Sequence, residues 1–155
     1  MRHRIFVMRH AERPADAADS GLSPAGAARA AALASYFPAA FGKPHTIFAA
    51  ASSTHSRRPL LTVAPLAAAC DLEVDTSFGD ADTEALAEAL CRETGIPEPI
   101  VVCWRHGGLP SLLQRLGAPA GSYPDPWDAA VFNLMLALRY GIASAPAVTT
   151  VIEPF

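Results

Sequence analysis

Residues 99–108, PIVVCWRHGG, are the stretch that decides the fold class. The first six residues form an apolar run with an isoleucine and two valines, which predicts a buried β-strand over residues 99–104. An arginine, a histidine and two glycines follow at once, so the strand ends in ionisable side chains. Residues 109–116 then have the pattern of a helix that Gly117 closes.

The N-terminal segment has the same arrangement of an apolar strand followed by arginine and histidine. Residues 4–8, RIFVM, predict a second strand, and Arg9 and His10 come at its end. A third strand is predicted over residues 46–50, and the polar loop after it carries Arg58. Ligands of mainly parallel sheets bind outside the carboxyl ends of the strands. We therefore expect these three segments to bring cationic side chains to one edge of the sheet.

The remaining segments also alternate between helices and strands. Ser23 is a good N-cap and Pro24 suits the first helical position, which predicts a helix to about residue 36, before Pro38 and Gly42 end it. Further elements are predicted as helices over residues 59–69 and 83–92, a short strand over residues 72–75, and a closing hairpin of residues 131–140 and 147–152. Residues 131–139 are equally compatible with a helix, because so apolar a run has no diagnostic periodicity.

This alternation predicts one α/β domain over residues 1–155. We expect a three-layer sandwich in which a mixed, mainly parallel sheet has helices on both faces. Pro154 near the end of the chain favours an edge position for the last strand.

Composition narrows the classes of function. The chain has 155 residues and a formal net charge of −3, so no overall basic field attracts nucleic acid or an anionic membrane. Cys70, Cys91 and Cys103 are widely spaced in apolar segments, which predicts reduced, buried thiols rather than disulfides or a zinc site. Neither a secretory signal nor a membrane-spanning run is recognisable. We expect a cytoplasmic protein whose oligomeric state the sequence leaves open.

The candidate residues have the chemistry of a phosphate-binding site, since they comprise two arginines, two histidines and the start of a helix. Arg9 and Arg58 supply rigid bidentate donors for phosphate oxygens. His10 can attack phosphorus through an unprotonated ring nitrogen when its other nitrogen keeps its proton and donates it in a hydrogen bond to a backbone carbonyl. A protonated His106 adds positive charge, and Gly107 lets the backbone N–H groups approach the phosphate closely. The set predicts a phosphate pocket that needs neither a metal nor another cofactor.

Four segments, in order, resemble the histidine phosphatase (phosphoglycerate mutase-like) superfamily. IFVMRHAERP at residues 5–14 is similar to its strand with the RHG signature, and LSPAGAARAAALASYF at residues 22–37 to the helix that follows. SRRPLLTVAPLA at residues 56–67 resembles the segment with the second phosphate-binding arginine. VVCWRHGGLPSLLQRLG at residues 101–117 resembles the segment with the second histidine. The resemblance identifies a small single-domain member and extends over roughly three-quarters of the chain.

The resemblance implies a role for each matching residue. His10 would be the nucleophile that becomes phosphohistidine, and Arg9 would bind the phosphate beside it. Arg58 would be the second phosphate-binding arginine, while His106 and Gly107 would complete the pocket.

The choice between the two adjacent arginines rests on spacing. The family's arginine precedes a threonine by four positions, which Arg58 and Thr62 satisfy, whereas Arg57 misses by one and is the fallback. The glycine of the RHG signature is Ala11 here, a small change for the backbone.

The family's general-acid glutamate, which protonates the leaving oxygen, has no clear match. Asp80, Asp82 and Glu84 lie in a loop where an acid could arise, and Glu12 and His55 are other options. Without an acid, the enzyme would favour good leaving groups such as those of a phosphohistidine or an acyl phosphate.

These features predict a phosphomonoester hydrolase that acts through a phosphohistidine on His10. The chain is short for the superfamily and lacks long insertions that would cap the pocket, so an open site suits bulky substrates such as phosphoproteins. A mutase must retain a small intermediate in a closed pocket, which argues against that activity. The alternative is a catalytically silent phosphate-binding or interaction module of the same fold, which the missing acid favours and His10 opposes.

Overall fold

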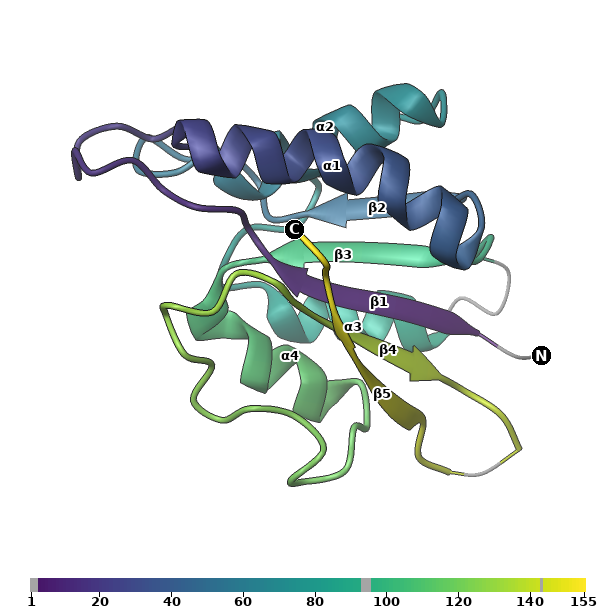
Figure 1. Cartoon of the computed structure of the whole chain (residues 1–155). Helices are drawn as coiled ribbons and strands as arrows, with labels where there is room; N and C mark the ends of the chain where they lie inside the picture. The colour runs from purple at the N-terminus through teal and green to yellow at the C-terminus, as the bar shows by residue number, and fades with distance from the viewer. Residues whose placement is uncertain (1–2, 93–95, 143) are drawn as a thin grey trace.

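The computed structural model describes residues 3–92, 96–142 and 144–155. At its centre is a five-stranded sheet with the spatial order β2-β3-β1-β4-β5 (Figure 1). The strands are β1 (Arg4–Arg9), β2 (Thr46–Ala49), β3 (Ile100–Trp104), β4 (Leu134–Arg139) and β5 (Ala147–Ile152). β1 and β2 run parallel to β3, whereas β4 pairs antiparallel with both β1 and β5. The predicted mixed sheet with a parallel core is confirmed.

The two strands that carry histidine at their ends are direct neighbours. β1 and β3 pair in register from Ile5 with Ile100 to Arg9 with Trp104. Every residue of β3 is buried, because helices cover both faces of this part of the sheet. Burial of each large apolar side chain contributes about 1.5–3 kcal/mol, which explains why the uninterrupted apolar runs form the central strands.

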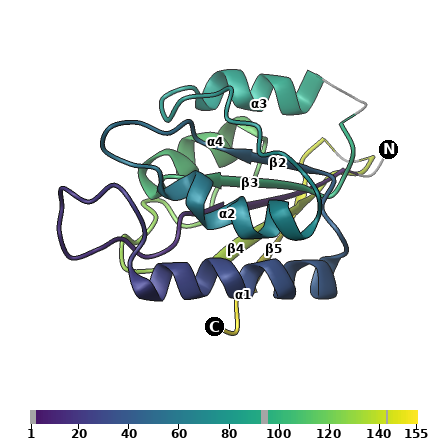
Figure 2. The ribbon, with the colours of Figure 1, turned by 90° about the horizontal axis from the view of Figure 1, so that it is seen from above.

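Helices cover both faces of the sheet. α1 (Pro24–Phe41) and α2 (Arg58–Ala69) share one apolar cluster with one face, and they lie side by side (Figure 2). α3 (Thr83–Arg92) and α4 (Leu109–Arg115) share a second apolar cluster with the opposite face. The predicted three-layer sandwich is therefore confirmed.

The helix α1 begins where the sequence predicts and ends later. The Ser23 hydroxyl accepts a hydrogen bond from the Gly26 N–H at 3.0 Å, as an N-cap does. The helix then continues through Pro38 to Phe41, five residues beyond the predicted end. Pro38 lies in the last turn, where it removes only one helical hydrogen bond. Phe41 packs on Phe6 with 4.7 Å between ring centroids, and this contact outweighs the proline.

The structure decides whether residues 131–139 form a strand or a helix, and it tests the short strand predicted over residues 72–75. Residues 131–139 do not form a helix, since β4 and β5 pair as the predicted hairpin and β5 is an edge strand. The predicted short strand over residues 72–75 is wrong, because Asp75 forms only an isolated bridge with Phe48 at the edge of the sheet.

Two of the three cysteine side chains are buried. Cys70 and Cys103 are buried as predicted, but Cys91 is exposed, because it lies in the last turn of α3 on the side away from the core. Within the described ranges, no helix combines the length and the apolar character that crossing a membrane requires.

Candidate active site

The strand order brings the predicted site residues to one edge of the sheet. His10 directly follows β1, and its N–H donates to the Trp104 carbonyl at the end of β3 at 3.0 Å. His106 begins the short 3-10 turn η1 (His106–Gly108) between β3 and α4. Arg58 is the first residue of α2. Three segments that are distant in the sequence therefore meet at the carboxyl ends of the parallel strands.

The imidazole of His10 is buried and has a fixed orientation. Its Nδ1 lies 2.7 Å from the Ala11 carbonyl oxygen, so the ring donates from Nδ1 and leaves Nε2 unprotonated. Burial lowers the pKa of His10 to about 4, and the positive charges of Arg9, Arg58 and His106 act in the same direction. His10 is neutral at physiological pH and has the form that a nitrogen nucleophile requires.

The guanidinium of Arg9 lies between the two histidine segments. One terminal nitrogen donates to the Ala129 carbonyl oxygen at 2.6 Å, and the other lies 3.4 Å from His106 Nδ1. The group is stacked over the Phe132 ring at 3.9 Å from its centroid. Burial and the charge of Arg13 lower the pKa of Arg9 to about 10, so the group keeps its charge at neutral pH. Its buried Nε has no hydrogen-bond partner in the described part of the chain.

Arg58 is held by the loop that precedes α1. Its Nε donates to the Gly21 carbonyl oxygen at 2.9 Å, and one terminal nitrogen donates to that of Asp19 at 2.6 Å. Its charge lowers the pKa of His10, which places the two groups within electrostatic reach. Arg57 is exposed and its Nε reaches the Ser20 hydroxyl at 3.3 Å. Of the two adjacent arginines, Arg58 is the one beside the histidine.

The threonine used to choose between these arginines has a visible structural role. Thr62 Oγ1 donates to the Arg58 carbonyl oxygen at 2.8 Å and accepts from the Ala11 N–H at the same distance. Thr62 thus connects the first turn of α2 to the loop after His10. The bond to the Arg58 carbonyl is the one that a threonine hydroxyl commonly makes to the residue four positions earlier in a helix.

His106 is half-buried on the other side of Arg9. Burial, followed by the charges of Arg9 and Arg105, lowers the pKa of His106 below its ordinary value. A Cβ atom at Gly107 would meet no atom within 4 Å, which leaves open space beside the backbone. At Gly108 a Cβ atom would lie 3.0 Å from the Trp104 ring, so glycine is needed there for packing.

The general-acid candidates are engaged in other contacts. Glu12 accepts from the Arg29 guanidinium at 2.7 Å, Asp82 accepts from the Gly79 N–H at 2.8 Å, and Glu84 pairs with Arg115. His55 is exposed. Asp80 alone contacts a neighbour of the histidines, because its carboxylate pairs with Arg105 at 2.8 Å.

Sequence reasoning missed part of the site. The side chain of Arg13 is exposed, and its charge contributes to the lowered pKa values of Arg9, Arg58 and His106. Its closeness to His10 in the sequence was the only signal. The stacking of Phe132 on Arg9 gives no sequence signal, because the two residues are far apart in the chain.

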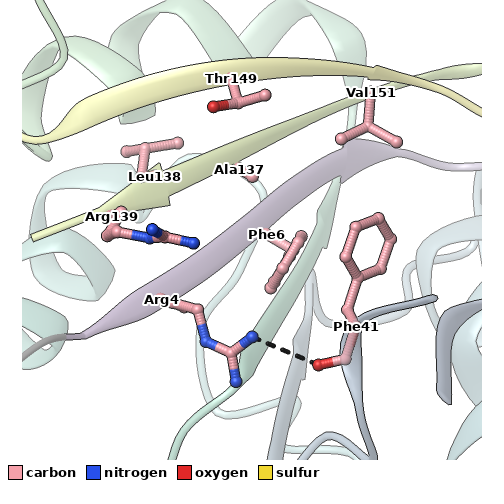
Figure 3. Close-up of a pocket in the computed structure, with 8 residues that line it drawn as sticks. All are labelled: Arg4, Phe6, Phe41, Ala137, Leu138, Arg139, Thr149 and Val151. Carbon is pink, nitrogen blue, oxygen red and sulfur yellow. Dashed lines mark hydrogen bonds between the residues drawn. The ribbon is translucent and has the colours of Figure 1, made fainter. Parts of the chain in front are cut away.

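A groove of about 500 Å³ adjoins His106. His106 and Gly107 border it at one end, and Asp125 comes from the loop that faces α4. A second cavity of about 150 Å³ lies at the opposite end of β1, between Arg4 and the hairpin strands (Figure 3). It is not part of the site, since His10 follows the other end of that strand. Among the described residues, no group of three or more His, Cys, Asp or Glu side chains could hold a metal ion.

Comparison with known proteins shows which solved structures share this fold. No protein-family model matches the chain, and no curated protein matches its sequence. Solved structures do match over nearly the whole chain. One is the protein histidine phosphatase SixA complexed with tungstate, at a TM-score of 0.69 and 14% identity, with 96% of each chain covered.

Two further structures agree with this result. The putative phosphohistidine phosphatase SixA from Agrobacterium tumefaciens has a TM-score of 0.66 at 18% identity and covers 97% of this chain and 98% of its own. A mycobacterial glucosyl-3-phosphoglycerate phosphatase has a TM-score of 0.62 at 17% identity, with 99% of each chain covered. At these identities the likeness establishes a common α/β fold.

Proposed function

We propose that this chain is a histidine phosphatase, a metal-independent hydrolase of phosphate monoesters that works through a phosphohistidine on His10. The observation that carries the proposal is the state of His10, a buried neutral imidazole whose Nδ1 is bound to the Ala11 carbonyl. Its Nε2 is left for attack. Arg9, Arg58 and His106 are close enough to affect its pKa through their charges.

The reaction needs positioning and charge stabilisation more than covalent machinery. The phosphate would accept hydrogen bonds from Arg9 and Arg58, and its charge would favour protonation of His106. His10 Nε2 attacks phosphorus, the bond to the leaving group breaks, and the electron pair departs with that group. Water then attacks the phosphohistidine, the N–P bond breaks, a proton passes to solvent, and phosphate leaves neutral His10 behind.

The contacts of the candidate general acids indicate which leaving groups the substrate carries. The carboxylates of Glu12, Asp80 and Asp82 each contact a cation or a backbone N–H, and among the described residues no contact directs any of them towards His10. We infer that the enzyme prefers phosphates with good leaving groups. A phosphoprotein carrying phosphohistidine would fit this requirement, and one of the structures with this fold bears the name protein histidine phosphatase.

We also infer a cytoplasmic location, where free thiols such as the exposed Cys91 stay reduced.

The first experiment is hydrolysis of 4-nitrophenyl phosphate in the presence of a chelator, for the wild type and the His10→Ala variant. We expect hydrolysis by the wild type, none by the variant, and an acid-labile phosphate label on the wild type alone. Loss of wild-type activity in chelator would overturn metal independence. Binding of inorganic phosphate without any label would instead identify the silent module.

A further inference from the structure

The groove beside His106 has the size of a binding site for a small organic group. Its volume of about 500 Å³ lies within the usual range for ligand pockets of roughly 300–1,000 Å³. His106 contacts Arg9 on one side and borders the groove on the other. A molecule whose phosphate lies on Arg9 and His106 therefore extends into this groove.

Polar groups line the groove from two sides. Ser111 and Gln114 lie three residues apart on α4, so both side chains are on one face of that helix. Asp125 faces them from the loop between α4 and β4. Hydroxyl, amide and carboxylate groups together can accept and donate hydrogen bonds to a polar ligand.

Asp125 is exposed, and its neighbours in the sequence restrict its backbone. It lies between Pro124 and Pro126, whose rings restrict the backbone. Trp127 anchors the loop, because its side chain is only 3% exposed in the core. The Ala129 carbonyl accepts the hydrogen bond from Arg9, which ties the same loop to the phosphate end of the site.

The charges divide the site into two regions. Arg9 and Arg58 make the phosphate end positive, whereas Asp125 is the only lining residue of the groove with a formal negative charge. A carboxylate next to a leaving group penalises a second anion and favours a hydrogen-bond donor or a cation.

We propose that this groove holds the leaving group of the substrate and that Asp125 selects leaving groups that are uncharged or cationic and donate hydrogen bonds. The inference rests on the phosphatase function proposed above. It makes Asp125 a specificity-determining residue and disfavours phosphate esters of hydroxy acids.

The test uses phenyl phosphates that differ in charge but little in leaving ability. Their para substituents are hydroxymethyl, aminomethyl or carboxylate. For the wild type we expect kcat/KM to be about tenfold lower for the carboxylate than for the hydroxymethyl compound, and highest for the aminomethyl compound.

Two substitutions should move this preference in opposite directions. Asp125→Asn should raise kcat/KM for the carboxylate compound relative to the hydroxymethyl compound about fivefold, a gain that a folding defect cannot produce. Gln114→Glu, which adds a negative charge to the groove, should lower the same ratio. The exposed Glu73→Gln substitution, outside the groove, serves as the matched control and should leave the ratio at the wild-type value.

The outcomes separate the two proposals. An unchanged ratio in Asp125→Asn, or no preference in the wild type, would overturn the inference while hydrolysis of 4-nitrophenyl phosphate and the phosphate label on His10 persist. Absence of all hydrolysis and of the label would overturn the phosphatase function, and the inference with it.

Discussion

The imidazole of His10 owes its orientation and its protonation state to its neighbours. The hydrogen bond to the Ala11 carbonyl orients the ring, and burial keeps it neutral. Arg9 is oriented by the Ala129 carbonyl and the Phe132 ring, and Arg58 by the carbonyls of the loop before α1. Each guanidinium is therefore fixed before any phosphate arrives, which lowers the entropic cost of binding.

The protonation of His10 should affect stability at low pH. Its folded pKa of about 4 is below the ordinary value of 6.5, so the unfolded chain binds more protons between these values. Stability should therefore fall as the pH drops from 6.5 towards 4, by up to about 3 kcal/mol. Urea unfolding across this range should show a smaller decline for His10→Gln than for the wild type. Parallel curves for the two proteins would contradict the assignment, and the exposed His45→Gln serves as control.

The two adjacent arginines should differ sharply in their effect on catalysis. Arg58→Ala removes a fixed donor beside His10, and we expect kcat/KM to fall by about 10²–10³. Arg57→Ala removes an exposed group, so we expect a change of less than about threefold. Steady-state kinetics with 4-nitrophenyl phosphate measure both. A larger effect for Arg57→Ala would show that the phosphate-binding arginine had been misassigned.

At the scale of elements, the central strands could be predicted because burial on both faces requires uninterrupted apolar runs. β1 and β3 meet this requirement, and the residues that follow them were correctly placed at the sheet edge. The sequence does not decide between a hairpin strand and a helix for residues 131–139, since an apolar run such as β4 lacks periodicity. The end of α1 was misjudged because the contact of Phe41 with Phe6 is not local in the sequence.

The same reasoning explains what could be predicted of the site. The choice of Arg58 rested on the resemblance, whose four-residue spacing to a threonine Arg58 and Thr62 share. The surroundings of Arg13 and Asp125 could not be predicted, because they depend on how separate loops meet. The acid candidates were chosen by position in the chain, whereas their contacts are set by partners such as Arg29 and Arg105.

The packing of α1 against the loop after His10 leads to a prediction at this scale. A Cβ atom at Gly26 would lie 2.3 Å from the Glu12 carbonyl oxygen, a backbone atom that cannot move alone. We expect Gly26→Ala to destabilise the fold by about 2–3 kcal/mol by pushing α1 away from that loop. Gly141→Ala, where a Cβ atom meets nothing within 4 Å, is the control. Equal unfolding midpoints in urea for both variants would refute the argument.

Across the whole molecule, one cluster connects the beginning, the first helix and the end of the chain. Arg29 on α1 pairs with Glu12 at 2.7 Å and with Glu153 at 3.6 Å, and it also donates to the Phe155 carbonyl. Two carboxylates thus share one guanidinium. The C-terminal segment is thereby attached to the helix that supports the loop after His10.

This cluster should give a pH dependence opposite to that of His10. Burial raises the pKa of Glu153 to about 7, so the folded chain binds more protons than the unfolded chain between pH 4.5 and 7. Stability should fall as the pH rises through this window. Glu153→Gln should remove that loss and be about 1–3 kcal/mol more stable than the wild type at pH 8, measured by urea unfolding. A variant less stable than the wild type at pH 8 would contradict this.

The sheet order has a consequence for biosynthesis. β1 leaves the ribosome well before its neighbours in the sheet, β3 and β4, which begin at Ile100 and Leu134. The nascent chain must therefore carry an apolar strand with both edges unpaired until β3 and β4 have been synthesised. His10 reaches its hydrogen-bonded position beside Trp104 only then. The proposed nucleophile is therefore translated well before the strands that fix its position.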